Sequence, residues 1–237
     1  SAADKVALQI DVEERPTGSL QLSAGYSSLE RFIFSFSIEQ RNFRGRGQTV
    51  NLSANVSSYS KSVQLGFVEP YLFGRNLALG FDVFRKDYNS FTWGTDNERR
   101  TTYEQVTTGF QVRVGTAITE YWQAQLRYGL SHDDVSLSEE YFTDGKCDPI
   151  KAGRYLCDAL GTYTTSALGY SLMYDTLDNR LRPTRGQRLV INQDIAGLGG
   201  TVKYVRSRIN YDKYFRLPGG FILDLGGEAG NIFGLGG

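Results

Sequence analysis

Apolar and polar residues alternate with a period of two along almost the whole chain of 237 residues. Successive side chains of an extended strand point to opposite faces, so this alternation predicts strands with one apolar and one polar face. The segments between them show no convincing helical period. We predict eleven strands, at residues 18–26, 31–40, 48–57, 62–69, 76–88, 102–115, 120–135, 163–174, 187–195, 202–215 and 220–230.

The composition is typical of a β protein that is rich in turns. The chain contains 27 Gly, 15 Tyr and 14 Phe, against one Met, one His and five Pro. Its 26 basic residues balance its 26 acidic ones, so nothing indicates a nucleic-acid partner or a polybasic membrane anchor. The apolar fraction of 40% is that of a folded chain rather than a disordered one.

The alternation fits two architectures. In a soluble β-sandwich the apolar face looks inward, whereas in an outer-membrane barrel it looks outward to lipid. Hydropathy does not separate the two. No stretch approaches the roughly 18 apolar residues of a membrane helix, but a membrane-spanning strand needs only about 9–11 residues, half of them polar.

Three features favour the barrel. Many predicted strands have ten or more residues, whereas strands of globular proteins average about five or six. One set of connections is compact ("RNFRGRG", "EPYLFGR", "RLPGG"), and the other includes long polar stretches at residues 86–101 and 136–162. Aromatic residues lie near the predicted strand ends, as interfacial girdles require: Phe43, Tyr71, Phe73, Tyr88, Tyr121, Trp122, Tyr174 and Phe215.

The segment before Pro16 has a different character. In "KVALQIDVEE", residues 5–14, the apolar side chains share one face, and charges and turn residues follow. We interpret this segment as the last strand of a separate soluble domain. The alternative is an ordinary first strand of the barrel.

The number of strands predicts that the sheet continues beyond this sequence. Bacterial single-chain barrels close with an even number of strands. An open edge in hydrocarbon would leave about ten backbone groups without partners, each at a cost of several kcal/mol. We therefore expect the sequence to be a fragment of a larger barrel.

The two cysteines, Cys147 and Cys157, lie in a polar segment with Gly and Pro, with nine residues between them. This spacing suits a disulfide that staples a loop in an oxidising compartment, and the alternative is two unpaired thiols. The C-x-x-C spacing is absent and the chain has a single histidine, which argues against a zinc site.

No sequence motif indicates catalysis or a cofactor. The P-loop, dinucleotide-binding, zinc-protease and nucleophile-elbow patterns are absent. His132 lies beside Ser131, Asp133 and Asp134, but neighbours on a strand point to opposite faces, which favours solvated polar residues over a catalytic triad. We predict no enzymatic activity, no cofactor and no metal.

Four segments carry a resemblance to a known family. The stretch "YDTLDNRLRPTRGQR", residues 174–188, resembles a periplasmic turn of the BamA-type outer-membrane protein assembly factors, in the POTRA-barrel insertase superfamily. "NFRGRGQTV" (42–50) and "EPYLFGRNLALGF" (69–81) resemble two earlier turns, and "VEERPTGSLQLSAGY" (12–26) resembles the join between the last POTRA domain and the barrel. The motif of the first turn falls on Tyr174, Asp175, Asp178, Pro183, Thr184 and Gly186.

The resemblance implies a transmembrane, antiparallel, up-and-down β-barrel. Within that family the barrel has sixteen strands, so this chain would carry the first eleven and stop inside the sixth extracellular loop. Residues 1–17 would be the end of the last periplasmic POTRA domain and a linker, and residues 18–237 the N-terminal part of the barrel. The barrel would contact outer-membrane lipid in a Gram-negative bacterium.

The resemblance also implies a function. The protein would fold and insert nascent outer-membrane β-barrel proteins, with accessory periplasmic lipoproteins as partners. Its first strand would be a lateral gate that offers its edge to a client strand. The alternative is a secretion or passive pore of the same superfamily, such as a two-partner secretion transporter, lined by Gln123, Gln125, Arg127, Arg206 and Arg208. The gate strand would comprise Ser19, Leu20, Gln21, Leu22, Ser23, Ala24, Gly25 and Tyr26.

Overall fold

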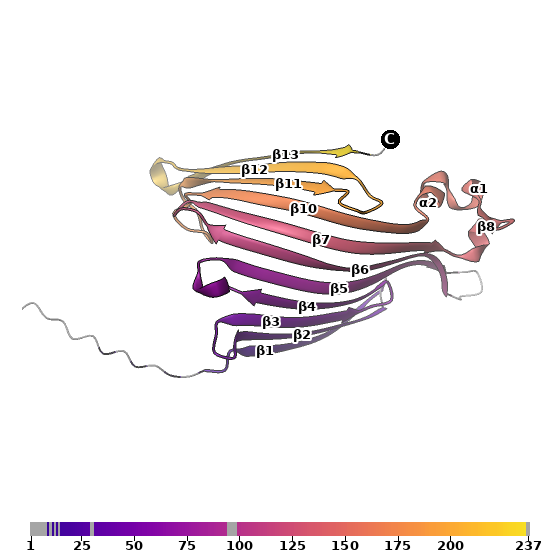
Figure 1. Cartoon of the computed structure of the whole chain (residues 1–237), viewed down its shortest axis with the longest axis horizontal. Coiled ribbons are helices and arrows are strands. Elements are labelled where there is room, and N and C mark those ends of the chain that lie inside the picture. The colour runs from indigo at the N-terminus through magenta and orange to yellow at the C-terminus, as the bar shows by residue number, and fades with distance from the viewer. Residues whose placement is uncertain are drawn as a thin grey trace, which may run out of the picture.

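The computed structural model describes residues 9, 11, 13, 15–28, 31–93 and 99–235, and within them eleven strands form one antiparallel sheet. Consecutive sheet strands are neighbours, and β1 and β13 form the two edges (Figure 1). A separate two-stranded hairpin of β8 and β9 is inserted between β7 and β10. The sheet strands are β1 (Gly18–Ser27), β2 (Arg31–Phe43), β3 (Gln48–Val56), β4 (Ser60–Glu69), β5 (Ala78–Trp93), β6 (Arg99–Ala117), β7 (Trp122–Leu137), β10 (Gly161–Asp175), β11 (Gly186–Ala196), β12 (Tyr204–Arg216) and β13 (Ile222–Gly234).

The predicted all-β, up-and-down architecture is confirmed. Each of the eleven predicted segments coincides with a sheet strand, and the differences are confined to strand ends. The sheet is not closed, because β1 and β13 do not pair with each other. The predicted strand at residues 5–14 falls largely outside the described residues.

Across the described ranges, no helix is both long enough and apolar enough to cross a bilayer.

The predicted loop at residues 86–101 is largely wrong. β5 continues to Trp93 and β6 begins at Arg99, so most of this polar stretch is paired strand. Ladder hydrogen bonds join main-chain groups and need no apolar face, so a polar sequence can extend a hairpin. Residues 94–98 lie outside the described residues.

The other long connection, between β7 and β10, contains short elements that the sequence analysis missed. They are η2 (Glu139–Tyr141), β8 (Phe142–Thr143), β9 (Lys146–Cys147), α1 (Pro149–Ala152) and α2 (Arg154–Asp158). α1 begins where Asp148 accepts a hydrogen bond from the backbone N–H of Ile150 at 2.9 Å, and Pro149 occupies the first helical position. Helices of four and five residues are too short to produce a periodic pattern.

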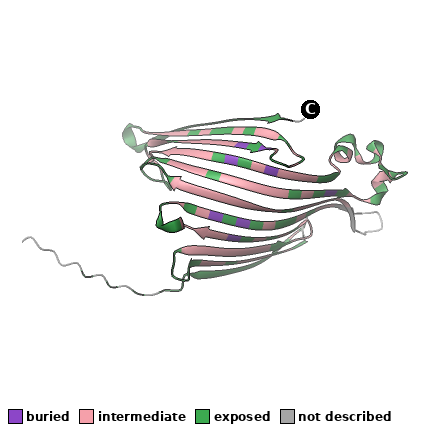
Figure 2. Cartoon of the chain, viewed as in Figure 1, coloured by how far each residue is buried: buried purple, intermediate pink, exposed green. Residues whose placement is uncertain are grey.

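The apolar face of the sheet is turned outward. Among the described residues the buried apolar side chains are those of Val135 and Ala196, whereas Leu22 is 72% exposed, Phe32 63% and Leu65 50%. Exposed positions recur along the strands, and β1 and β13 are exposed over almost their whole lengths (Figure 2). The accessible surface of 17167 Å² compares with about 11,000 Å² for a folded water-soluble monomer of this mass. The soluble sandwich is therefore wrong, since no second layer covers the apolar face in the described part of the chain.

Aromatic residues mark both ends of the strands. At the end with the short turns, the ring of Tyr174 lies 4.9 Å from that of Trp122 and 6.4 Å from that of Tyr121. At the opposite end, the rings of Tyr88 and Tyr103 are 6.4 Å apart. Two bands of aromatic residues separated by apolar strand faces are typical of a sheet that spans a bilayer.

Candidate functional site

β1 is the N-terminal edge of the sheet. It pairs with β2 along its whole length, from Gly18 opposite Gln40 to Ser27 opposite Arg31. Its other side has no neighbouring strand among the described residues. All eight predicted gate residues, 19–26, lie in this strand, with Leu20, Leu22 and Tyr26 exposed on the apolar face. A strand paired on one side only presents a row of unpaired main-chain donors and acceptors.

Both ends of β1 are held to β2, the C-terminal end by the pairing of Tyr26 with Phe32 and of Ser27 with Arg31. The N-terminal end is fixed, because the backbone N–H of Arg41 donates to the carbonyl of Thr17 at 3.0 Å and the Gln40 side chain donates to the Thr17 hydroxyl at 2.8 Å. A Cβ added at Gly18 would lie 2.5 Å from Gln40 Oε1, the end of a flexible side chain. A Cβ added at Gly25 would meet nothing within 4 Å.

The turn between β10 and β11 brings the predicted motif residues together around Asp178. Oδ1 of Asp178 accepts hydrogen bonds from the backbone N–H groups of Asn179 at 3.0 Å, Thr184 at 2.9 Å and Arg185 at 3.2 Å, and its Oδ2 accepts one from the Thr184 hydroxyl. These bonds, the Thr184 hydroxyl first, hold the pKa of Asp178 well below its usual value. The carboxylate therefore organises a ten-residue turn that has no regular secondary structure.

Other members of the motif close the same turn. Asp175 accepts a hydrogen bond from the N–H of Leu177 at 3.0 Å. Gly186 has a φ of +106°, and a Cβ there would lie 2.3 Å from the carbonyl oxygen of Thr176, which excludes any other residue. Tyr174 contributes its ring to the aromatic band. Pro183 is half-buried within the turn.

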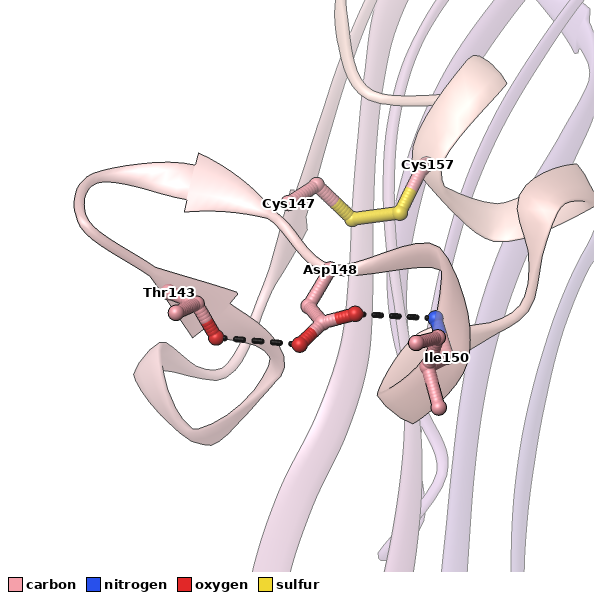
Figure 3. The surroundings of a disulfide bond; sticks show 5 residues. All are labelled: Thr143, Cys147, Asp148, Ile150 and Cys157. Carbon is pink, nitrogen blue, oxygen red and sulfur yellow. Dashed lines mark hydrogen bonds between the residues drawn. A yellow bond between two sulfur atoms is a disulfide. The ribbon is translucent and has the colours of Figure 1, made fainter.

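Cys147 and Cys157 are joined in the structure, with their Cα atoms 5.6 Å apart (Figure 3). Cys147 ends the hairpin of β8 and β9, and Cys157 lies in α2. Asp148 adds polar links to the same region, because it accepts hydrogen bonds from the Thr143 hydroxyl at 3.0 Å and from the N–H of Ile150 at 2.9 Å. The disulfide would hold together the connection between β7 and β10, which lies at the end of the sheet opposite the short turns (Figure 1).

The polar face carries an ion-pair cluster that spans four strands. Asp194 on β11 is 7% exposed and lies between Arg127 on β7, at 2.7 Å, and Arg206 on β12, at 2.8 Å. Arg127 also donates to the hydroxyl of Ser171. Gly169 on β10 stands between the partners: its Cβ would lie 2.0 Å from Asp194 Oδ1 and 3.0 Å from Arg127 Nε. The missing side chain lets the two charged groups meet across an intervening strand.

A second cluster repeats this arrangement. Asp82 on β5, 7% exposed, pairs with Arg113 on β6. A Cβ at Gly66 would lie 2.7 Å from Asp82 Oδ1, and one at Gly80 would lie 2.7 Å from Arg113 Nε. In both clusters, glycines leave room for the charged side chains to meet, and the ion pairs hold neighbouring strands together on the polar face.

No catalytic arrangement stands out near His132. Its Nδ1 and the hydroxyl of Thr164 share a hydrogen bond at 3.0 Å, and His132 lies on the face opposite to Ser131 and Asp133. Asp133 accepts hydrogen bonds from Gln105 and Thr107 on the neighbouring strand. In the described ranges, no three His, Cys, Asp or Glu side chains are placed to hold a metal ion.

The family model described as the Omp85 superfamily domain matches residues 42–237 of this chain. The chain belongs to the Omp85 superfamily. A curated Omp85-type relative, the outer membrane protein assembly factor BamA of Neisseria meningitidis serogroup B, is 29% identical over 245 residues, which cover 98% of this chain and 29% of the relative. The chain thus spans less than a third of the length of that relative.

Two solved structures share the fold of this chain. BamA from Haemophilus ducreyi lacking POTRA domains 1–3 superposes with a TM-score of 0.69 at 23% identity, covering 94% of this chain and 42% of that one. CdiB from Acinetobacter baumannii superposes with a TM-score of 0.52 at 13% identity, covering 90% and 39%. The predicted resemblance to the BamA-type proteins is confirmed.

Arg127, Arg206 and Arg208 were expected from the sequence to line a pore, but their acidic partners were not predicted. Asp194 holds the first two, and Glu228 pairs with Arg208 at 2.9 Å. Asp82 and Asp194 are charged residues on the polar face of their strands, and each lies opposite a glycine of the neighbouring strand, Gly66 and Gly169 respectively. This pairing of a charge with a glycine is the signal that could have identified them.

Proposed function

We propose that the protein is an outer-membrane protein assembly factor, which folds and inserts client β-barrel proteins into the outer membrane of a Gram-negative bacterium. Membership of the Omp85 superfamily, together with the 29% identity to BamA of Neisseria meningitidis serogroup B, is the observation that carries the proposal. The place of β1 at the N-terminal edge of the described sheet and the fold shared with BamA from Haemophilus ducreyi support it. Because the chain spans only part of these relatives, the activity is proposed for the whole protein.

The mechanism is β-augmentation at the edge of β1. A client strand would bind through main-chain hydrogen bonds, which give affinity with little dependence on the sequence of the client. The apolar side chains of Leu20, Leu22 and Tyr26 would keep this edge at the depth of the lipid, where each backbone pair formed avoids a desolvation cost of several kcal/mol. Such a gate lowers the barrier to insertion without covalent chemistry or nucleotide.

The edge is supported by a firm hairpin. The ring of Tyr26 on β1 contacts that of Phe32 on β2 edge-on at 5.3 Å, and the ring of Phe32 lies 6.2 Å from that of Phe34 on the same strand. Aromatic pairs across neighbouring strands stabilise a hairpin beyond their buried area. β1 would therefore stay attached to β2 while its other side exchanges partners.

The proposal extends to the surroundings of the barrel. Residues 18–237 would be the N-terminal part of a larger barrel, and residues 1–17 the end of a periplasmic POTRA domain and its linker. Accessory periplasmic lipoproteins would bind on the POTRA side, and lipid would cover the outward apolar face. The support is the share of the relatives that the chain covers, 29% of BamA from Neisseria meningitidis serogroup B.

The alternative of a secretion or passive pore has weaker support. Of its five expected lining residues, Arg127 and Arg206 share an ion pair with the single carboxylate of Asp194, and Arg208 pairs with Glu228. A conducting lining presents charges to the passing ion or chain, whereas paired charges on a polar face serve to hold neighbouring strands together.

A proline scan of β1 in the whole protein tests the gate. Pro would replace Gln21, Leu22, Ser23 and Ala24 one at a time, and the assembly of a client barrel would be measured in proteoliposomes. The N–H groups of successive residues in an antiparallel strand point alternately to the two sides, and Pro removes one donor. Two positions should therefore stop client assembly and leave the stability of the barrel unchanged.

The other two positions are the internal control, because their N–H groups face β2. They should lower the stability of the barrel through the lost pairing with β2. Equal effects at all four positions, or unchanged client assembly at all of them, would contradict the gate.

A further inference from the structure

The short turns carry exposed arginines. Six of them are exposed and form no ion pair among the described residues. Five lie in the β2–β3, β4–β5 and β10–β11 connections, and the sixth is the last residue of β12, directly before the β12–β13 connection: Arg44, Arg46, Arg75, Arg182, Arg185 and Arg216. We call these residues the turn arginines. Two further arginines of this end are paired, Arg41 with Glu39 at 2.5 Å and Arg180 with Asp175 at 3.6 Å.

The acidic groups near the turn arginines accept hydrogen bonds from other donors, and Arg46 also acts electrostatically on one of them, Glu69. The carboxylate of Asp178 accepts the hydrogen bonds that organise its own turn, and this lowers its pKa. Glu69 accepts hydrogen bonds from the Gln48 side chain and from the N–H of Tyr71. The β2–β3 and β4–β5 turns contain no acidic residue of their own. The β6–β7 turn at the same end contains Glu120 and no basic residue, so the excess of positive charge belongs to the four turns that carry the turn arginines.

An exposed apolar side chain accompanies the arginines in each of these four turns. The guanidinium of Arg44 lies 5.4 Å from the centre of the Phe43 ring. Phe73 is 87% exposed two residues before Arg75, Leu181 is 93% exposed beside Arg182, and Phe221 is 70% exposed in the turn that follows Arg216.

The opposite end of the sheet lacks this pattern. The connection between β7 and β10 mixes acidic and basic residues, with Glu139, Glu140 and Asp144 close to Lys146 and Lys151. The excess of arginine is thus a property of one end and not of the whole chain, whose 26 basic and 26 acidic residues balance.

We propose that the turn arginines bind the phosphate headgroups of anionic phospholipids in the membrane leaflet that meets the short turns. The proposal rests on the outer-membrane location proposed above. A guanidinium matches a phosphate in charge and in hydrogen-bond geometry, and a neighbouring apolar side chain can enter the acyl region at the same depth. The turns follow directly on the aromatic band of Trp122 and Tyr174, which lies at the height of the headgroups.

The apolar neighbours favour lipid over an acidic protein partner. An acidic protein surface would satisfy the arginines but would leave Phe73 and Leu181 against polar groups. A lipid interface accepts both kinds of side chain at once.

The test uses the whole protein in phosphatidylcholine vesicles. Electron paramagnetic resonance would compare the association of spin-labelled phosphatidylglycerol with that of spin-labelled phosphatidylcholine. The variant R44Q/R75Q/R182Q/R216Q removes one arginine from each turn, and none of these four is in an ion pair in the described structure. The matched control, K61Q/K146Q/R154Q/K203Q, removes four positive charges from the other end.

We expect the unmodified protein to prefer phosphatidylglycerol about fivefold at low salt, from roughly one arginine contact per bound lipid. The preference should fall close to one in the turn variant and in 1 M salt, and persist in the control. A protein without preference, a turn variant that keeps it, or a control that loses it equally would overturn the proposal. So would a turn variant that loses a bound acidic protein while its lipid preference stays unchanged.

Failure of this inference is distinguishable from failure of the proposed function. Insertion into pure phosphatidylcholine vesicles and client assembly there do not require an anionic headgroup. A protein that inserts and assembles clients but shows no lipid preference refutes the headgroup site alone.

Discussion

Replacing Gly169 by alanine should break the ion-pair cluster on the polar face. Gly169 on β10 lies opposite Asp194 of β11 on one side and opposite Arg127 of β7 on the other. The new methyl group would lie 2.0 Å from Asp194 Oδ1, far inside van der Waals contact, and 3.0 Å from the backbone oxygen of Gln193. The carboxylate must therefore swing away, and both hydrogen bonds from Arg127 to Asp194 are lost.

The magnitude follows from the burial of the partners. Overpacking costs about 1–3 kcal/mol, and separating a buried ion pair costs about 3–5 kcal/mol. The lower part of this range applies, because the side chain of Arg206 is 51% exposed and can turn to water, whereas those of Arg127 and Asp194 are 18% and 9% exposed. We expect G169A to lower the free energy of unfolding by about 2–4 kcal/mol.

Urea unfolding of the whole protein in lipid vesicles, followed by tryptophan fluorescence, measures this loss. The matched control is G129A. Gly129 shares the face of β7 that carries Arg127, and a Cβ added there would lie 3.9 Å from the Phe110 carbonyl oxygen. We expect the control to stay within about 0.5 kcal/mol of the unmodified protein.

A double-mutant cycle identifies the cause. If the alanine acts through Asp194, the double variant G169A/D194A should be no less stable than D194A alone. The reasoning is refuted if G169A is as stable as G129A, or if the effects of G169A and D194A simply add.

Two further predictions concern the connections. D178A should increase amide hydrogen exchange at Thr184 and Arg185, whose N–H groups bond to Asp178 at 2.9 and 3.2 Å; slow exchange at both in the variant would contradict this role. The pKa of Asp178 is lowered in the folded state, so its contribution to stability is complete above the usual pKa of 3.8 and is lost only as pH falls through the lower folded pKa. The protection of these amides, corrected for intrinsic exchange, should therefore not change between pH 7 and pH 5. Cys147 and Cys157 should resist a thiol-reactive maleimide until reductant is added, and labelling of the unreduced protein would refute the disulfide. The variant C147S should expose the thiol of Cys157, and amide exchange should become faster at residues 142–158 but not in the sheet.

The sheet could be predicted because one local rule governs it. A membrane strand must alternate, so the apolar run of Phe32, Phe34 and Phe36 marks β2 without any knowledge of its neighbours. The ends of β5 and β6 could not be predicted, because pairing outside the lipid needs no alternation. The helices at residues 149–158 are too short to show a period.

The ion pairs could not be predicted from local sequence. Arg127 and Asp194 are 67 residues apart, and their contact depends on the register of three strands. The edge position of β1 likewise depends on topology. Its alternation, with Leu20 and Leu22 against Ser19 and Gln21, is that of any barrel strand, so only the resemblance singled it out.

Site-specific photocrosslinking in living cells tests the central proposal, that β1 binds client strands, most directly. A photoreactive residue would replace Gln21 or Ser23, two polar-face positions of β1, in the whole protein. The control would replace Gln125 in β7, which is paired on both sides. We predict crosslinks from both β1 positions to several different nascent outer-membrane proteins, and none from the control. Crosslinks from Gln21 and Ser23 only to other parts of the same protein would mean that the edge stays closed, and would contradict the proposed gate.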